Sequence, residues 1–378
     1  MTVLTGCDRD GTLDPIVDDP VDPANVVVTP KVATPPSIDG DASDAAWDQA
    51  SSTFISTAVV DIPAFAGYGG RNYQIQFKAV YDDDNIYFLA KYNDATLDAD
   101  RETWYFDTDS DSWVQESRWP QFDDDGNLVR MGFYEDKLSM IWEASPVEGF
   151  STSGCGVACH VGLSPFQNDA GKTALKYTNN FGETLDMWHL KYVRSAGTSI
   201  PTMDDQYTDW TSTAGNGGRH SDPGVNSYVN NKQTIDGKSL PLYVLNNPTG
   251  PYFWISPDDI SSGNALTVTN VDDDGNLSLS NGGTVSSSDA NYQRGGAFRP
   301  PSVYTRVPNG DRADITAKAV YAGGFWTVEI QRSLITGSDV DVQFDNMAKD
   351  YPFGIAVFDN AAIAHGSSTE PYFIRFSN

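Results

Sequence analysis

The stretch KAVYDDDNIYFLAKYND, residues 78–94, decides the fold class of this 378-residue chain. Apolar and polar side chains alternate up to Tyr81, a run of aspartates and an asparagine interrupts the pattern, and a second apolar run begins at Ile86. Alternation with a period of two is typical of a half-buried strand, and an Asp/Asn cluster between two such runs is typical of a turn. The stretch therefore predicts a β-hairpin over residues 72–93, because the alternation continues back to Tyr73.

Composition favours the all-β class as well. Gly (33), Pro (21), Tyr (18), Phe (18) and Trp (9) are plentiful, and long runs of Ala, Leu, Glu and Lys at helical spacing are absent. Further strands are expected at residues 26–34, 132–142 and 372–376. Between the first of these and the hairpin, a turn should lead into a short helical piece that delivers Trp47 to the core.

Net charge restricts the classes of partner. Fifty-two acidic residues against twenty-four basic ones give a formal charge of −28, which repels nucleic acid and anionic lipid surfaces. A nucleic-acid partner is therefore excluded. The charge is consistent either with high solubility or with electrostatic steering of a basic redox partner. No apolar run approaches the roughly 18 residues that span a bilayer, so we expect membrane contact only through an N-terminal lipid anchor.

The N-terminus carries a candidate for that anchor. The sequence LTGC at residues 4–7 matches the end of a bacterial lipoprotein signal, in which the cysteine becomes the lipidated first residue. Only six residues precede Cys7, so we expect a truncated or misassigned start; the alternative is a chance cysteine in a flexible tail. Residues 1–25 are thus read as a signal remnant and a flexible acidic tether, and residues 26–378 as the folded domain.

The segment GCGVACH, residues 154–160, holds two of the three cysteines, with a histidine directly after the second. Covalent haem attachment needs this order of groups, because two thiols add to the vinyl groups of one porphyrin and the adjacent imidazole becomes an axial ligand. Three residues separate Cys155 from Cys159, where two are usual. A disulfide is the alternative, although it leaves His160 to chance; a zinc site would need one more close ligand.

Several motifs flank this loop in order along the chain. They are PSIDGDASDAAW at 36–47, the hairpin itself, EDKLSMIW at 135–142, DMWHLK at 186–191, GGFWTVEIQR at 323–332 and FGIAVFDN at 353–360. Together they resemble the family-9-like carbohydrate-binding β-sandwich, and more specifically the haem-binding domain related to the γ subunit of ethylbenzene dehydrogenase. The DMWHLK segment departs from that family's pattern, since Leu190 replaces its second tryptophan.

The resemblance covers about residues 31–195 and 311–376. It implies an all-β fold, a β-sandwich of jelly-roll or immunoglobulin-like type with few short helices. Between the two matching blocks, residues 201–309 are rich in Gly, Ser, Asn, Asp and Pro. We expect them to form a long, loop-rich insertion packed on the sandwich.

A single covalent haem c would take His160 as its proximal ligand, and a second axial group must come from elsewhere. We favour His189, because Trp188 and Trp142 would provide aromatic walls beside it. The b-type relative for which the family is named uses Met and Lys as its axial pair. By resemblance, that pair keeps Met131, Met140 and Lys191 open. The remaining candidates by residue type are His365, His220, Met187 and Met203.

A second candidate metal site lies at residues 107–112. Asp107, Asp109 and Asp111 alternate as at the start of a calcium loop. Ser112 and Arg118 stand where such a loop has its glycine and its final acidic residue, so solvated turn acids are the preferred reading over calcium.

No nucleophile-base pair, phosphate-binding glycine loop or paired-carboxylate motif is readable, so the chain is expected to be an electron-transfer protein or subunit rather than an enzyme. Its redox partner would be a separate molybdenum enzyme subunit of the dimethylsulfoxide-reductase type or another cytochrome. Because lipid and haem are both attached outside the cytoplasmic membrane, we expect a lipid-anchored protein at the periplasmic or extracellular face. The alternative function is a carbohydrate-binding β-sandwich module without redox activity, with exposed Trp and Tyr as sugar platforms.

Overall fold

The hairpin predicted at residues 72–93 lies at the centre of the fold. In the computed structural model it consists of β3 (Asn72–Tyr81) and β4 (Asn85–Asn93), which pair antiparallel. The Asp82 carboxylate accepts a hydrogen bond from the backbone N–H of Asn85 at 2.8 Å and so fixes the turn. The prediction of this hairpin is confirmed.

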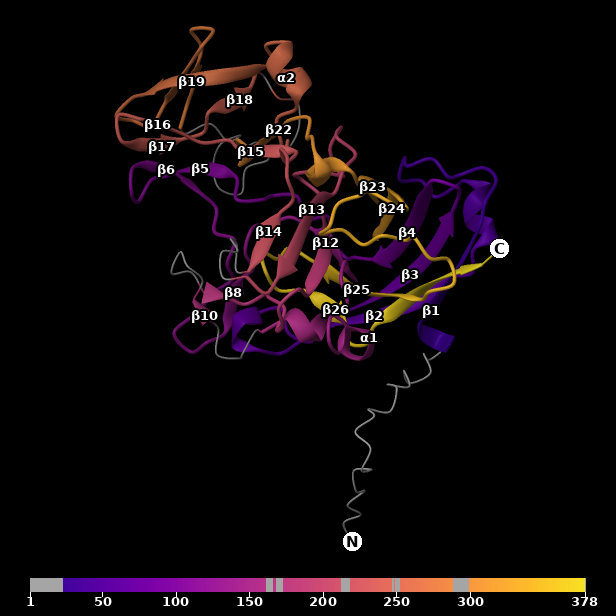
Figure 1. The fold of residues 1–378 in the computed structure, drawn as a ribbon. Helices are drawn as coiled ribbons and strands as arrows, with labels where there is room; N and C mark the ends of the chain where they lie inside the picture. Colours follow the sequence, from indigo (N-terminus) through magenta and orange to yellow (C-terminus); the bar gives the residue numbers. More distant parts are fainter. Residues whose placement is uncertain are drawn as a thin grey trace.

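The structure describes residues 23–160, 166–167, 173–211, 218–246, 248, 252–287 and 299–377. The predicted lipidation site, Cys7, and most of the predicted tether lie outside these residues. Figure 1 shows the described chain as a sandwich of strands with a smaller lobe on one side.

One extended sheet folds back on itself to make the sandwich. Its strand order is β14-β13-β12-β9-β25-β26-β2-β3-β4-β24-β23, with β27 paired to β25 and β1 paired to β27. The strands added to the hairpin are β1 (Val26–Pro30), β2 (Thr53–Val59), β9 (Lys137–Glu143), β12 (Thr184–Lys191), β13 (Asp204–Asp209), β14 (Arg219–Ser221), β23 (Thr316–Ala322), β24 (Phe325–Ser333), β25 (Tyr351–Phe358), β26 (Gly366–Ser368) and β27 (Tyr372–Ser377). The short β26 pairs with β25 on one side and with β2 on the other, and so joins the two halves.

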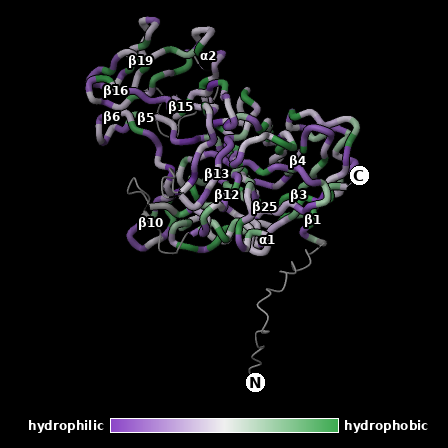
Figure 2. Tube along the Cα trace, in the orientation of Figure 1, coloured by the Kyte–Doolittle hydropathy of each residue, from purple (hydrophilic) through white to green (hydrophobic). Residues whose placement is uncertain are grey.

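The main core fills the space between the halves. Phe88 on β4 lies 5.6 Å, ring centroid to centroid, from Trp142 on β9, and Phe77 on β3 lies 5.4 Å from Phe353 on β25. Each strand supplies alternate residues to this core, and Figure 2 shows hydrophobic and hydrophilic residues interleaved along the strands. The predicted all-β sandwich is therefore the fold. The strand expected at 132–142 begins later than predicted, at Lys137.

Helical segments are few and short among the described residues. They are η1 (Pro23–Asn25), η2 (Ala45–Gln49), η3 (Pro63–Phe65), α1 (Phe150–Ser153), η4 (Gly154–Ala158), α2 (Pro257–Ser261) and η5 (Asp311–Ala313). As predicted, η2 buries Trp47, in a satellite core on the outer face of the hairpin, where its indole N–H donates to the Glu329 carboxylate at 2.8 Å. No helix in the described part of the chain is long and apolar enough to cross a membrane.

The stretch predicted as an insertion, residues 201–309, divides into two parts. Its first strands, β13 and β14, extend the main sheet, so the expected loop-rich insertion contributes to the sandwich as well as to the lobe. The rest forms the lobe at the upper left of Figure 1, together with β5 and β6. The lobe has its own core of Trp104, Trp113, Leu240, Val244, Leu266, Val268, Leu277 and Leu279.

The remaining strands are short and pair locally. They are β5 (Trp104–Asp107), β6 (Ser112–Gln115), β7 (Gln121–Phe122), β8 (Leu128–Arg130), β10 (Phe166–Gln167), β11 (Thr173–Ala174), β15 (Tyr228–Asn230), β16 (Gln233–Ile235), β17 (Lys238–Leu240), β18 (Tyr243–Leu245), β19 (Ala265–Val271), β20 (Leu277–Leu279), β21 (Thr284–Val285) and β22 (Val303–Thr305). None of them joins the main sheet.

Candidate functional site

The cysteine segment covers the outer face of the half of the sandwich that contains β9, β12 and β25. After β9 the chain passes through α1 into η4, which carries Cys155. Gly354 on β25 allows this close approach, because a Cβ atom there would lie 3.0 Å from a methyl carbon of Ile141 and 3.5 Å from the Cβ of Cys155. The glycine in the middle of a strand thus has a packing reason.

An apolar pocket lies between this segment and the sheet. It encloses about 540 Å³ of empty space, part of which is open to solvent. Most of its wall is aliphatic, with Ile141, Ile355 and Ala356 among the lining residues. Both Cys155 and Cys159 line it, so the topology brings the two thiols to one cavity. The part of it that can hold water-sized spheres is about 60 Å³, which is well below the range of about 300–1,000 Å³ that is usual for cofactor sites. A cofactor as large as a haem would therefore need the cysteine segment to move away from the sheet.

The two cysteines are free thiols in this structure, so the disulfide considered from the sequence is not formed. Burial, and next the neighbouring Cys159, raise the pKa of Cys155 to about 11. The first thiol is therefore neutral at physiological pH. The zinc alternative finds no support in the described residues, because the groups of potential ligands that are close enough to hold a metal ion contain only aspartates.

His365, one of the alternative ligands, lines the same pocket. Its Nδ1 lies 2.7 Å from the carbonyl oxygen of Ile363, so this nitrogen carries the proton and donates it. Burial, and next the nearby Lys176 and Lys137, lower the pKa of His365 to about 3. The ring is therefore a neutral imidazole with Nε2 as its unprotonated nitrogen, which is the form that binds a metal ion.

His160 does not line the pocket, although it follows Cys159 directly. Its ring stacks on Tyr177 with centroids 3.8 Å apart and planes inclined by 9°, and its Nε2 lies 3.1 Å from the Tyr177 carbonyl oxygen. The predicted proximal ligand would have to give up these contacts before it could bind an iron in the pocket.

His189, the ligand favoured from the sequence, lies just beyond the pocket wall. It is on the outer face of β12, and its ring centroid is 5.6 Å from that of Phe358, which does line the pocket. Its Nδ1 is 3.1 Å from Nη1 of Arg219, so Nδ1 accepts and Nε2 carries the proton; Nε2 is buried and has no partner. Burial and Lys191 lower the pKa of His189 far below its usual value.

Trp142 and Trp188 do not form the aromatic walls that the sequence predicted. Their ring centroids are 4.9 Å apart on the inner face of the sheet, within the main core, and both are fully buried. Alternation along a strand is the reason: their neighbours Ile141 and Met187 face outward and line the pocket instead.

Two of the remaining ligand candidates line the pocket, namely Met140 at its edge and Met187 from β12. The others are occupied elsewhere. Met131 contacts Arg71 at 3.7 Å, Met203 is in the main core, Lys191 forms an ion pair with Asp204, and His220 stacks on Tyr207 with its Nε2 3.0 Å from Asp209. The structure thus brings together the two cysteines, His365 and Met187.

Cationic groups surround the pocket in a chain whose net charge is −28. Lys176 lines it, and burial lowers the pKa of Lys176 to about 8, with Arg219 as the next cause. Lys137 is buried beside it, with its Nζ 4.1 Å from the Phe358 ring centroid and donating to the Ala362 carbonyl oxygen at 3.0 Å. Sequence reasoning missed these cations, because nothing local distinguishes them from surface lysines and arginines.

The calcium candidate at residues 107–112 is the turn between β5 and β6. Asp109 and Asp111 are exposed, and the Ser110 hydroxyl donates to Asp107 at 2.6 Å. Within the described chain these aspartates do not form a group of ligands close enough to hold an ion. The arrangement is that of solvated turn acids.

These features define an all-β sandwich with a thiol-lined apolar pocket on one outer face. The chain belongs to the ethylbenzene dehydrogenase family, because a family model described as "Ethylbenzene dehydrogenase" matches residues 44–370. Membership of this family, expected from the motifs, is confirmed.

Two further comparisons complete the picture. No protein of curated function matches the sequence significantly. Solved structures similar to this chain include a family 9 carbohydrate-binding module from Caldicellulosiruptor kristjanssonii in complex with glucose, with 10% identity, 93% of this chain and 96% of that chain covered and a TM-score of 0.32. A structure of a family 9 carbohydrate-binding module from the same organism in complex with cellotriose has 10% identity, covers 93% of this chain and 94% of that chain, and has a TM-score of 0.31.

Proposed function

We propose that this chain is a monohaem c-type cytochrome that transfers single electrons, with its haem attached to Cys155 and Cys159. One observation carries the proposal: two free thiols from a CxxxCH segment face one apolar pocket that a neutral imidazole, His365, also lines. Membership of the ethylbenzene dehydrogenase family supports it.

The chemistry of the residues around the pocket fits a haem. The thiols provide the attachment points, the aliphatic wall excludes water, and His365 offers an unprotonated Nε2 as an axial ligand. His160, which the attachment motif assigns as the other ligand, takes this role only when its ring leaves Tyr177. A bound haem supplies one-electron chemistry at its iron, whereas the protein sets the potential through ligands and burial.

The cations near the pocket have a place in this proposal. Haem carries two carboxylate groups, and burying them requires compensating positive charge. Lys176, Lys137 and Arg219 would provide it. In the protein alone, burial lowers the pKa of both lysines. Binding a dianion would reverse those shifts.

As the electron partner we propose a separate redox protein, either the molybdenum subunit of an enzyme of this family or another cytochrome. The formal charge of −28 favours a partner with a basic docking surface. Attachment of lipid at Cys7 would hold the protein at the periplasmic or extracellular face of the membrane. The chain itself has no catalytic role in this proposal.

A carbohydrate-binding module is the other function considered from the sequence. Such a site uses aromatic platforms, and the structure does expose Trp119 and Trp210. Neither of them lines the pocket, where Phe358 is the sole Phe, Tyr or Trp among the described lining residues. The pocket is therefore better suited to a haem than to a sugar.

Expression with export and a haem-maturation system tests the proposal. We expect a Soret band that survives acid-acetone extraction in the wild-type chain and is lost from the Cys155→Ser, Cys159→Ser double variant. Cys7→Ser removes the third thiol and should keep the band, which makes it the matched control. A folded wild-type protein without colour would contradict the proposal.

The axial ligand is tested separately by visible spectra of the attached haem. His365→Ala is expected to change the low-spin bands, because it removes an imidazole that lines the pocket. His189→Ala, just beyond the wall, is expected to leave the band positions in place. The opposite pattern would return the role to His189.

A further inference from the structure

A second group of side chains lies on the other face of the same strands. Asp205 on β13, Asp222 directly after β14 and Asp341 in the segment after β24 each place one carboxylate oxygen within 4.8 Å of the others. Their exposed fractions are 0%, 3% and 1%. Three carboxylates so close together and so far from water repel one another strongly.

The surrounding charges do not balance this group. Asp186 and Asp314 lie beside it, and Arg332 forms ion pairs with four of these five aspartates. Its Nη2 is 2.7 Å from Asp341, 3.6 Å from Asp186 and 4.0 Å from Asp205. Its Nε is 4.0 Å from Asp314. Arg312, the other arginine near Asp222, is itself paired with Asp204. Among the ion pairs of the described residues, one guanidinium therefore serves this group of carboxyl groups, and it cannot neutralise all of them when they are ionised.

Hydrogen bonds do not balance it either. Both carboxylate oxygens of Asp222 are buried without a donor, and so are Oδ1 of Asp186, Oδ2 of Asp205, Oδ1 of Asp314 and Oδ1 of Asp341. Buried polar atoms in folded proteins almost always have a partner. These oxygens are thus free to bind a cation.

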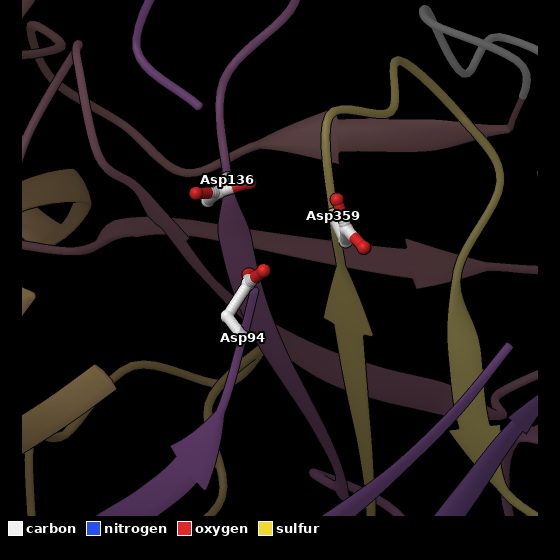
Figure 3. Close-up of side chains that lie close together, drawn as sticks. All are labelled: Asp94, Asp136 and Asp359. Carbon is white, nitrogen blue, oxygen red and sulfur yellow. The ribbon is translucent and has the colours of Figure 1, made fainter. Parts of the chain in front are cut away.

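A second aspartate group in the protein differs in that nearly all of its carboxylate oxygens have a hydrogen-bond or ion-pair partner. Figure 3 shows Asp94, Asp136 and Asp359, which come from the ends of three strands and lie around a common space. Here Arg71 pairs with Asp359 at 2.9 Å, and backbone N–H groups donate to both oxygens of Asp136. Only Oδ2 of Asp94 lacks a donor, so this group needs no ion.

We infer that Asp205, Asp222 and Asp341 bind a calcium ion, with Asp186 and Asp314 beside them. Calcium takes six to eight oxygen ligands at about 2.3–2.6 Å in flexible geometry, so ligand oxygens on opposite sides of it are about 4.8 Å apart. Magnesium demands a near-ideal octahedron and keeps several of its waters, which a closed site does not favour. The donor set, which consists only of carboxylate oxygens, excludes softer metals.

The position of the ion would tie together segments that are distant in sequence. It would hold β12, β13 and the segment after β14 to the segment that follows β24. Asp186 and Asp205 alternate along their strands with the residues that face the pocket, Met187 among them. The calcium site would thus stabilise the sheet on the face opposite the pocket. Calcium binding at this site would not depend on the haem.

Calcium titration of the full chain tests the inference. After treatment with EGTA and buffer exchange, calorimetric titration with CaCl₂ should show one saturable calcium ion per chain, and added CaCl₂ should raise Tm. Asp222→Asn should abolish both responses. Because this change removes a repelled charge and adds a donor, the variant should be at least as stable as wild type in EGTA, so its loss of response would not reflect unfolding.

Asp94→Asn, in the aspartate group of Figure 3, is the matched control and should bind calcium as wild type does. Three results would overturn the inference: no saturable calcium in the wild-type chain, unchanged binding in Asp222→Asn, or equal affinity for MgCl₂ and CaCl₂. The spectra that test the haem are measured separately, so failure of one proposal leaves the other distinguishable.

Discussion

Replacing Asp94 with asparagine should stabilise the protein at neutral pH and have little effect in acid. Asp94 follows β4, is 4% exposed and points toward Asp136 and Asp359 in Figure 3. Its Oδ1 accepts from the backbone N–H of Thr96 at 3.2 Å, and its Oδ2 has no donor. The asparagine keeps the first interaction and places an NH₂ group where the unpaired oxygen was.

The magnitude follows from the pKa of Asp94, which burial and then the charge of Asp359 raise from 3.8 to about 6. A raised carboxyl pKa means that the folded state binds the proton more tightly than the unfolded state. The free energy of unfolding therefore falls as pH rises from about 4 to about 6, and the full penalty is present above that window. At 1.36 kcal/mol per unit, two units correspond to about 3 kcal/mol.

Urea unfolding followed by tryptophan fluorescence, from pH 3.5 to pH 8, would measure this. The difference between Asp94→Asn and wild type should be near zero at the acid end and grow to about 3 kcal/mol at pH 7–8. Asp124→Asn, in an exposed turn, should show no such growth. A stability difference that is independent of pH, or a variant that is less stable at pH 8, would refute the reasoning.

Three more predictions concern single side chains in the sandwich. Gly354→Val should prevent haem attachment, because a side chain there would press on the cysteine segment at the pocket wall; retention of acid-stable colour would contradict this. Trp142→Ala should lower the free energy of unfolding by about 3–5 kcal/mol through a core cavity, measured by urea unfolding against the exposed Trp119→Ala, which should cost far less. Trp47→Phe should cost about 1.5–3 kcal/mol, since it removes the indole donor to the buried Glu329 carboxylate; thermal unfolding with no loss of stability would argue against that hydrogen bond.

Local pattern was enough to predict much of the fold. The alternation around residues 78–94 predicted the hairpin, because the period of side chains along a strand is a property of the backbone itself. The motifs in order predicted the family, and the spacing of Cys155 and Cys159 placed two thiols in one short segment. Alternation could also have shown that Trp188 and Met187 face opposite sides of β12.

What the sequence by itself could not decide was which side of that strand the cysteine segment covers. The tertiary structure places it on the Met187 side, which removes the tryptophans from the pocket and brings in His365 and Lys176. It also gathers Asp205, Asp222 and Asp341 on the other side. The physical reason is that both sites depend on strand pairing between distant segments, and this pairing is set by burial of the whole core rather than by any local run of residues.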